Sequence, residues 1–326
     1  MDEHRTLGGP DGPLVLAVDT STAALAAALV RGGEVLREVQ SLAERNHSVH
    51  TVTTVHAMLA ECGVQPEELD GIAIGRGPGS YTGMRIAVSL GKTLAWVWDK
   101  PLVGISSLEA LGFGRWLAER EGRGDASSAD VVPSEGAIAS GGGLISPSAA
   151  VVTGSAMPVP VEQAPLGMRT PGHAWIVPIM DARRGQVYTA SFSAGEENVP
   201  GGWERLASDA IRLMRDWVDE LAEAVAAADD AARPAAIWIV GELALHEAEA
   251  DRLQALCPGV QVRKLPAWME GRAVAALGAK RLAAGERDDV HAFAPNYTQL
   301  TEAEVKLQEK QTKETAAEGA VRDDAN

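Results

Sequence analysis

Three short segments near the start of the chain show the hydrophobic pattern of β-strands. Residues 14–19 and 23–30 are almost continuous apolar runs, residues 34–39 alternate between apolar and polar positions, and polar turns separate the segments. Such runs, bounded by turn residues, are typical of strands. The pattern therefore predicts three antiparallel strands that form a meander.

Helical and strand patterns alternate along the rest of the chain. The first group of predicted elements comprises a helix at 48–62, a strand at 71–75, a helix at 83–98, a strand at 102–105 and a helix at 107–119. The second group comprises strands at 174–182 and 187–193, a helix at 208–228, a strand at 237–241, a helix at 243–256, a strand at 260–265 and a helix at 271–284. The similar order of the two groups predicts an α/β protein with the duplicated fold of actin, Hsp70 and sugar kinases (the ASKHA fold). In that fold each half contains a mixed sheet flanked by helices.

Composition divides the chain into five segments. Residues 1–13 are polar and rich in Gly and Pro, residues 120–172 have no sustained hydrophobic period, and residues 301–326 are rich in charge. Segments of this kind bury too little apolar area to offset the entropy lost on ordering. We therefore expect an N-terminal half at 14–119 and a C-terminal half at 173–300, with a disordered N-terminus, a flexible insertion and a charged C-terminal tail.

The charge balance limits what the chain can bind by itself. It carries 29 basic and 45 acidic residues among 326, a net charge of −16, and the basic residues form no cluster. A protein that binds nucleic acid directly needs a basic surface to displace counterions from the phosphates. We therefore expect another protein to hold most of any RNA substrate.

The cysteines and the lengths of the apolar runs bear on localisation. Cys62 and Cys257 are the only cysteines, and they lie far apart in sequence. No apolar run approaches the length of a membrane span. We expect a cytoplasmic protein that has no disulfide framework and does not insert into a membrane.

A glycine-rich segment between a predicted strand and a predicted helix is the most informative part of the sequence. It comprises Gly75, Arg76, Gly77, Pro78, Gly79, Ser80, Tyr81, Thr82, Gly83, Met84 and Arg85. Glycines permit backbone conformations closed to other residues, and Pro78 restricts the turn between them. With Thr82 as the helix cap, N–H groups at the helix start favour an anion, and Arg76 and Arg85 add positive charge. A tight turn that binds nothing explains the glycines equally well, and the Gly-Lys-Ser/Thr sequence of a Walker A loop is absent.

This segment resembles the GxGPGS[FY]TGxR signature of the TsaB (YeaZ) family. Further segments agree with the family in the same order, at residues 16–22, 46–48, 101–108, 181–188 and 295–297. They resemble its first strand and turn, the start of its first helix, the strand and helix after the signature, its D-A-R-x-G-x-V-Y segment and its P-x-Y motif. The resemblance covers residues 14–119 and 173–300.

The resemblance implies a subunit of the machinery that makes threonylcarbamoyladenosine in tRNA. Family members pair with TsaD, the enzyme that transfers the threonylcarbamoyl group to the adenosine following the anticodon, and TsaE, an ATPase, completes the complex. The TsaB-type subunit is implied to hold and activate TsaD, to have no catalytic residue and no metal site of its own, and to reach tRNA only through the complex.

A degenerate nucleotide site is also implied. The residues at its phosphate-binding and adenosine-binding positions are Asp19, Thr20, Ser21, Thr22, Asp181 and Gly241. From the residues alone, Asp19 could bind Mg²⁺ through water, but Asp, Ser and Thr also favour ordinary turns. Gly241 stands where a functional site needs two glycines, and the neighbouring Glu242 would repel phosphate. We expect no cofactor of its own, with a weak or interface-shared ATP or ADP with Mg²⁺ as the open alternative.

The helix at 83–98 is apolar over more of its surface than one-sided packing requires. We predict that it forms, together with the helix at 48–62, a surface that docks the corresponding helix pair of TsaD. The residues expected at this contact are Val49, Val52, Val55, Leu59, Ile86, Ala87, Leu90, Gly91, Leu94 and Ala95. Two alternatives remain open: the rest of the chain covers both helices, or the surface pairs two copies of this chain when the partner is absent.

Two other functions compete with this interpretation. An autonomous sugar-kinase-like, ATP-dependent phosphotransferase requires an intact second glycine site. A metallopeptidase of the glycoprotease type requires metal ligands, but the sequence contains no HExxH. His47 and His50 are three residues apart, whereas TsaD-like enzymes carry two metal-binding histidines at four-residue spacing.

Overall fold

The computed structural model describes residues 12–42, 47–123, 173–195, 202–229 and 232–298, with only the backbone of residues 42 and 47–50. Residues up to Asn296 belong to one compact unit, which is the unit described below. The predicted disordered N-terminus, insertion and C-terminal tail lie almost entirely outside the described residues.

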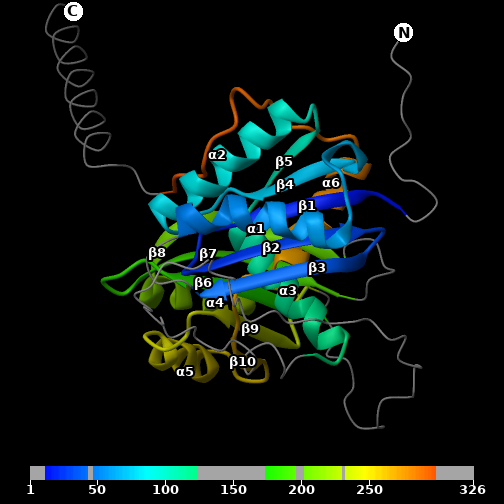
Figure 1. The fold of residues 1–326 in the computed structure, drawn as a ribbon. Helices are drawn as coiled ribbons and strands as arrows, with labels where there is room; N and C mark the ends of the chain where they lie inside the picture. The colour runs from blue at the N-terminus through cyan, green and yellow to red at the C-terminus, as the bar shows by residue number, and fades with distance from the viewer. Residues whose placement is uncertain (1–11, 43–46, 124–172, 196–201, 230–231, 299–326) are drawn as a thin grey trace, which may run out of the picture. The chain divides into compact units, whose positions relative to one another are not determined.

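The first sheet contains the predicted meander and two parallel strands (Figure 1). Its strands are β1 (Leu14–Asp19), β2 (Ala24–Arg31), β3 (Glu34–Leu42), β4 (Gly71–Gly75) and β5 (Leu102–Ile105). Their order is β3-β2-β1-β4-β5, with β1, β2 and β3 antiparallel and with β4 and β5 continuing parallel to β1. The helices of this half are α1 (His47–Cys62), α2 (Tyr81–Val97) and α3 (Ser107–Arg120). The predicted meander is confirmed.

The second sheet repeats this arrangement. Its strands are β6 (Ala174–Asp181), β7 (Gln186–Ala194), β8 (Trp203–Leu213), β9 (Ala236–Gly241) and β10 (Gln261–Pro266). Their order is β8-β7-β6-β9-β10, which matches the first sheet strand for strand. The helices are α4 (Met214–Ala227), α5 (Glu247–Leu256) and α6 (Gly271–Ala283). The duplicated ASKHA fold is therefore confirmed.

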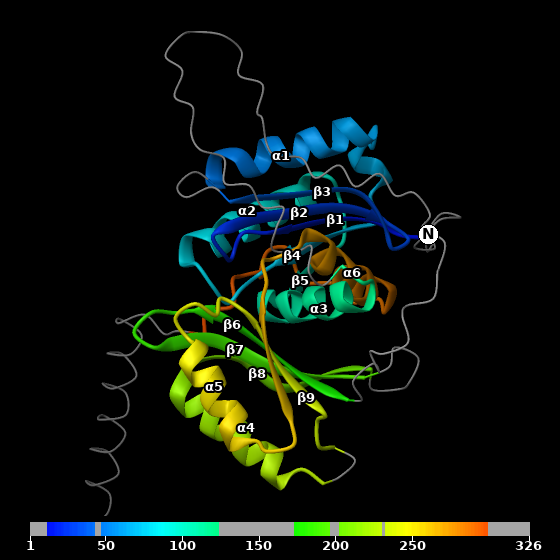
Figure 2. The same cartoon turned by 90° about the horizontal axis from the view of Figure 1, so that it is seen from below.

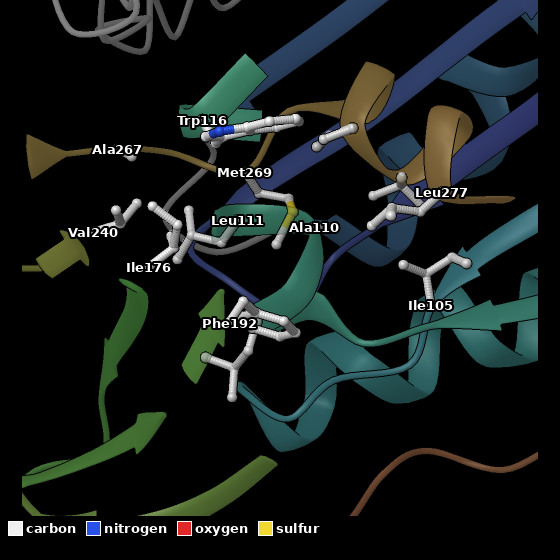
Figure 3. Packing of buried hydrophobic residues seen from close by; sticks show 14 of the residues in the cluster. Ile105, Ala110, Leu111, Trp116, Ile176, Phe192, Val240, Ala267, Met269 and Leu277 are labelled. Atoms are coloured by element: carbon white, nitrogen blue, oxygen red, sulfur yellow. The ribbon is translucent and has the colours of Figure 1, made fainter. Parts of the chain in front are cut away.

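The inner helices of the two halves are exchanged between the sheets. α3 packs against β6, β7 and β9 of the second sheet, whereas α6 packs against β1, β2 and β4 of the first. Figure 2 shows α3 and α6 between the sheets, with α1 and α2 on the outer face of the first sheet and α4 and α5 on the outer face of the second. The largest apolar cluster lies in this central layer and includes Ile105, Leu111, Phe192 and Leu277 (Figure 3).

Two predicted helices begin four or more residues later in the structure. The helix expected at 208–228 begins only at Met214, because residues 203–213 form β8. β8 pairs with β7 on one side only, and most of its side chains are exposed or half-buried, so its sequence shows no clear alternation. The helix expected at 243–256 begins at Glu247. Within the described part of the chain, none of the helices combines the length and the apolar character that a membrane span requires.

Candidate functional site

The glycine-rich segment connects β4 to α2, and two backbone hydrogen bonds hold its first part at Arg76. The Arg76 N–H donates to the Ile105 carbonyl oxygen at 2.9 Å, and the Asn296 N–H donates to the Arg76 carbonyl oxygen at 2.7 Å. The Gly77–Pro78 peptide bond is cis. Ser80 caps α2, because its Oγ accepts from the Gly83 N–H at 3.3 Å. The prediction that Thr82 is the cap is therefore wrong; it lies one residue inside α2.

This segment packs directly on the turn between β1 and β2. The Ser80 N–H donates to the Ser21 carbonyl oxygen at 2.6 Å, and the Thr20 hydroxyl donates to the Gly83 carbonyl oxygen at 2.6 Å. A Cβ atom added at Gly79 would lie 2.3 Å from the Ser21 carbonyl oxygen, and one at Gly83 would lie 1.8 Å from the Thr20 carbonyl oxygen. These glycines are therefore required for close backbone contact within the chain.

The carboxylate of Asp19 is fully enclosed by its own chain. Its Oδ1 accepts from the Ser21 N–H at 2.6 Å, and its Oδ2 accepts from the Ser107 hydroxyl at 2.6 Å. The Ser107 Oγ in turn accepts from the Gly77 N–H at 3.0 Å, and a Cβ at Gly75 would lie 1.8 Å from Asp19 Oδ2. Asp19 thus links the first turn, the glycine-rich segment and α3, and each of its carboxylate oxygens accepts a hydrogen bond from its own chain.

The other polar residues of the turn also bond within the chain. Thr20 is fully buried, and Thr22 exchanges hydrogen bonds with the backbone of Ala24, at 3.2 and 3.3 Å. Ser21 Oγ is buried and has no hydrogen-bond partner among the described residues. The turn therefore offers a phosphate few free donors. This observation favours the alternative of a tight turn without a ligand.

The corresponding turn of the second half is more open but is also internally bonded. Asp181 Oδ1 lies 3.1 Å from His246 Nε2, and the Asp181 N–H donates to Glu242 Oε2 at 2.9 Å. Burial raises the pKa of Glu242 above its ordinary value. Gly241 has a φ of +119°, and a Cβ there would lie 2.3 Å from the Ile179 carbonyl oxygen. Gly241 is therefore needed for the turn itself. The Glu242 carboxylate accepts its hydrogen bond from the backbone N–H of Asp181.

Metal-binding side chains do not gather anywhere in the described part of the chain. A group of three or more His, Cys, Asp or Glu residues placed to hold an ion is absent there. The side chains of His47 and His50 lie outside the described residues.

The predicted partner surface on α1 and α2 needs a substantial correction. Six of its residues are buried inside this chain, against the first sheet and the neighbouring helix: Val55, Leu59, Ala87, Leu90, Gly91 and Ala95. A Cβ at Gly91 would lie only 2.3 Å from Ile74 Cγ1. The small residues of α2 therefore allow close packing on β4, and the prediction that these six residues meet a partner is wrong.

The remaining predicted contact residues are more accessible. Ile86 and Leu94 are half-buried, Val52 is 58% exposed, and the side chain of Val49 lies outside the described residues. Sequence reasoning missed Trp96, which is 69% exposed, and left out of the predicted contact its neighbour Val97, which is 63% exposed. We refer to Val52, Trp96 and Val97 as the exposed apolar residues of α1 and α2. The available signal was a tryptophan one helical turn after Lys92, on the face of α2 that also carries Ser89.

Asp19→Asn is expected to gain stability relative to the wild type as the pH rises. Burial raises the pKa of Asp19 above 3.8, so the folded protein retains the proton at pH values where the unfolded chain has lost it. The stability from this group is fully present below the unfolded pKa and is lost as the pH rises through the folded pKa. Asparagine does not titrate and avoids that loss. Urea unfolding at a series of pH values measures the difference, with Asp216→Asn at an exposed position of α4 as the control. A pH-independent difference for Asp19→Asn would contradict the expectation.

Comparison with known proteins relates this chain to two groups of sequences. The TsaD family model, described as tRNA N6-adenosine threonylcarbamoyltransferase, matches residues 39–125. The tRNA threonylcarbamoyladenosine biosynthesis protein TsaB of Bacillus subtilis is 31% identical over 300 residues, which cover 91% of this chain and 99% of that protein. TsaB of Escherichia coli is 34% identical over 102 residues, or 30% of this chain and 44% of that protein.

Solved structures agree with the fold. YeaZ from Pseudomonas aeruginosa superimposes with a TM-score of 0.55 at 21% identity, over 87% of this chain and 99% of that one. A second Pseudomonas aeruginosa structure, described as similar to peptidase YeaZ, gives a TM-score of 0.56 at 21% identity, over 88% of this chain and all of that one. Because the Bacillus subtilis protein matches along nearly its whole length, this chain belongs to the TsaB (YeaZ) family of tRNA threonylcarbamoyladenosine biosynthesis proteins.

Proposed function

We propose that this chain is a non-catalytic partner and activator of a TsaD-type enzyme. The enzyme would transfer a threonylcarbamoyl group to the adenosine that follows the tRNA anticodon, and this chain would hold it in an active form. The observation that carries the proposal is that the region similar to the TsaD family, residues 39–125, contains α1 and α2 with their exposed apolar residues. Related folds present related faces, so the same helix pair on each protein can meet across a pseudo-symmetric contact.

The closed turn at Asp19 supports a role without chemistry. Phosphate-binding sites need N–H or hydroxyl donors aimed at the ligand, and here the glycine-rich segment and Ser107 use most of those groups. We therefore propose that the chain has no nucleotide site of its own. In this proposal any ATP or ADP lies at the contact with TsaD or on TsaE, the ATPase of the complex.

The charge of the chain supports indirect contact with tRNA. A net charge of −16 repels the phosphate backbone, so productive RNA binding requires basic surface on another subunit. We propose that tRNA reaches this chain only through the complex. Self-pairing through α1 and α2 in the absence of TsaD remains part of the proposal, because the exposed apolar residues would otherwise face water.

Threonylcarbamoylation of tRNA by TsaD, measured with and without this chain, tests the proposal. Product should form at a substantial rate only when this chain is added, with TsaE and ATP present in both reactions. Equal rates would overturn the proposed activation. Titration of the isolated chain with ATP and Mg²⁺ separates the alternative of an autonomous phosphotransferase, which requires tight binding, and metal analysis of the purified protein separates the metallopeptidase.

A further inference from the structure

A pocket of about 610 Å³ lies where the two halves meet, away from α1. It is formed by the end of β4, the junction of β5 and α3, the strand β8 and the C-terminal part of α6. The residues that line it are Arg76, Gly104, Ile105, Ser106, Glu109, Arg205, Ser208, Asp209, Leu277, Lys280, Arg281, Ala284, Glu286 and Asn296. The carboxyl ends of the parallel strands β4 and β5 open into it, which is where open α/β sheets commonly bind ligands.

Two basic side chains that line this pocket have N–H donors that no described residue uses. Neither the Arg76 guanidinium nor the Lys280 ammonium forms a side-chain hydrogen bond or ion pair with another described residue. Arg281, in contrast, donates to the Gly104 carbonyl oxygen and, at 2.7 Å, to Glu286. Arg76 is half-buried beside Gly104, where a Cβ would lie 2.9 Å from Arg76 Cδ. A guanidinium presents a planar set of N–H donors that matches a phosphate or carboxylate.

The wall formed by α3 and β8 carries fixed acceptors. Arg205 donates to Glu109 at 2.7 Å and to Asp209 at 2.6 Å, which holds both carboxylates in place. Asn296 donates from Nδ2 to Asp209 Oδ2 at 3.1 Å, and its own side-chain oxygen stays available as an acceptor. Ser208 is exposed at the same wall. These groups suit hydroxyl donors on a ligand.

The apolar part of the lining is small. Ile105, Leu277 and Ala284 supply it, and the lining residues include no Phe, Tyr, Trp or His. Stacking of a nucleobase on an aromatic side chain is therefore not available in this pocket. Its volume falls in the range of small-molecule sites, roughly 300 to 1,000 Å³, and exceeds what a single inorganic ion fills.

We propose that this pocket binds a phosphorylated sugar or polyol. The phosphate lies between Arg76 and Lys280, and the hydroxyl groups of the ligand donate to Glu109, Asp209 and Asn296. The proposal concerns a site apart from the exposed apolar residues of α1 and α2 and does not depend on the proposed partner. Its failure would leave that function untouched, because the test uses the isolated full-length chain.

Isothermal titration of the full chain with glucose 6-phosphate tests the site, with glucose, inorganic phosphate and AMP as comparison ligands. We expect saturable binding of glucose 6-phosphate and weaker binding of the other three. Arg76→Gln and Lys280→Gln should each weaken it roughly tenfold, the loss of one hydrogen bond to a charged group. Lys264→Gln, an exposed lysine of β10 outside the pocket, should leave binding unchanged.

Several results would overturn the proposal. If titration with glucose 6-phosphate showed no binding, the proposed site would be refuted. If both pocket variants bound it with unchanged affinity, the ligand would bind at another place on the protein. Equal or tighter binding of inorganic phosphate or AMP would contradict the role of the acceptor wall. Lys280 is exposed, so Lys280→Gln keeps the test valid even if Arg76→Gln alters the glycine-rich segment.

Discussion

Replacing Gly83 with alanine is expected to destabilise the protein by about 2 to 3 kcal/mol, although alanine is the better helix former. Gly83 lies in the first turn of α2, where alanine would otherwise gain about 1 kcal/mol. The added Cβ would lie 1.8 Å from the Thr20 carbonyl oxygen, so the helix and the first turn must separate. Overpacking of this kind costs typically 1 to 3 kcal/mol and sometimes more, and separation would also break the Thr20–Gly83 hydrogen bond.

Urea unfolding of the variant and wild type measures this effect through the transition midpoint. Gly195→Ala is the matched control, because a Cβ there meets no atom of the described residues within 4 Å and φ lies outside the left-handed range. We expect the control to change stability by only a few tenths of a kcal/mol. A Gly83→Ala variant as stable as this control would show that the first turn and α2 are not in close contact.

Trp96→Glu is expected to abolish the proposed pairing with TsaD while leaving the fold intact. Trp96 is 69% exposed, so its removal opens no cavity in this chain. A tryptophan buried at the centre of a protein contact commonly contributes 2 to 4 kcal/mol, and a carboxylate there would also lose its hydration. We expect the affinity for TsaD to fall roughly 100-fold or more. Titration of TsaD with the variant measures the affinity, and urea unfolding verifies the fold.

Leu245→Glu serves as the matched control for pairing. Leu245 is a large apolar residue with 79% exposure that lies just before α5, away from α1 and α2. The control should bind TsaD as the wild type does. Full affinity in Trp96→Glu would show that TsaD does not bind at this end of α2. Gly91→Arg is not a useful probe of pairing, because its side chain would enter the contact with Ile74 and unfold the protein.

The order of strands and helices could be predicted from sequence wherever a strand is buried on both faces. β1, β4 and β9 are continuous apolar runs bounded by turn residues, and their bounds are close to those predicted. β8 was missed because none of its side chains is fully buried and its own sequence does not alternate, so the helical period of α4 extends backwards over it. Its identity follows only from pairing with β7, which is information from outside the segment.

The glycine-rich segment lies between a strand and a helix, as predicted, but the sequence left two roles for its glycines open. Gly79 and Gly83 could make room either for a bound phosphate or for another part of the backbone. Only the fold shows that the carbonyl oxygens of Ser21 and Thr20 occupy the space next to these glycines. The same limit applies to α2. Helical periodicity groups Ala87, Gly91 and Ala95 on one face, yet it does not show which element covers that face.

The exchange of α3 and α6 has a consequence for synthesis on the ribosome. α6 covers β1, β2 and β4, and a Cβ at Gly278 would lie 2.3 Å from Ala73 Cβ. The inner face of the first sheet therefore remains exposed to water until α6, which ends at residue 283, has been synthesised. This happens long after β5, the last strand of that sheet, has left the ribosome. We expect the nascent N-terminal half to be a client of ribosome-bound chaperones, and the two halves produced as separate polypeptides to be insoluble unless they are made together.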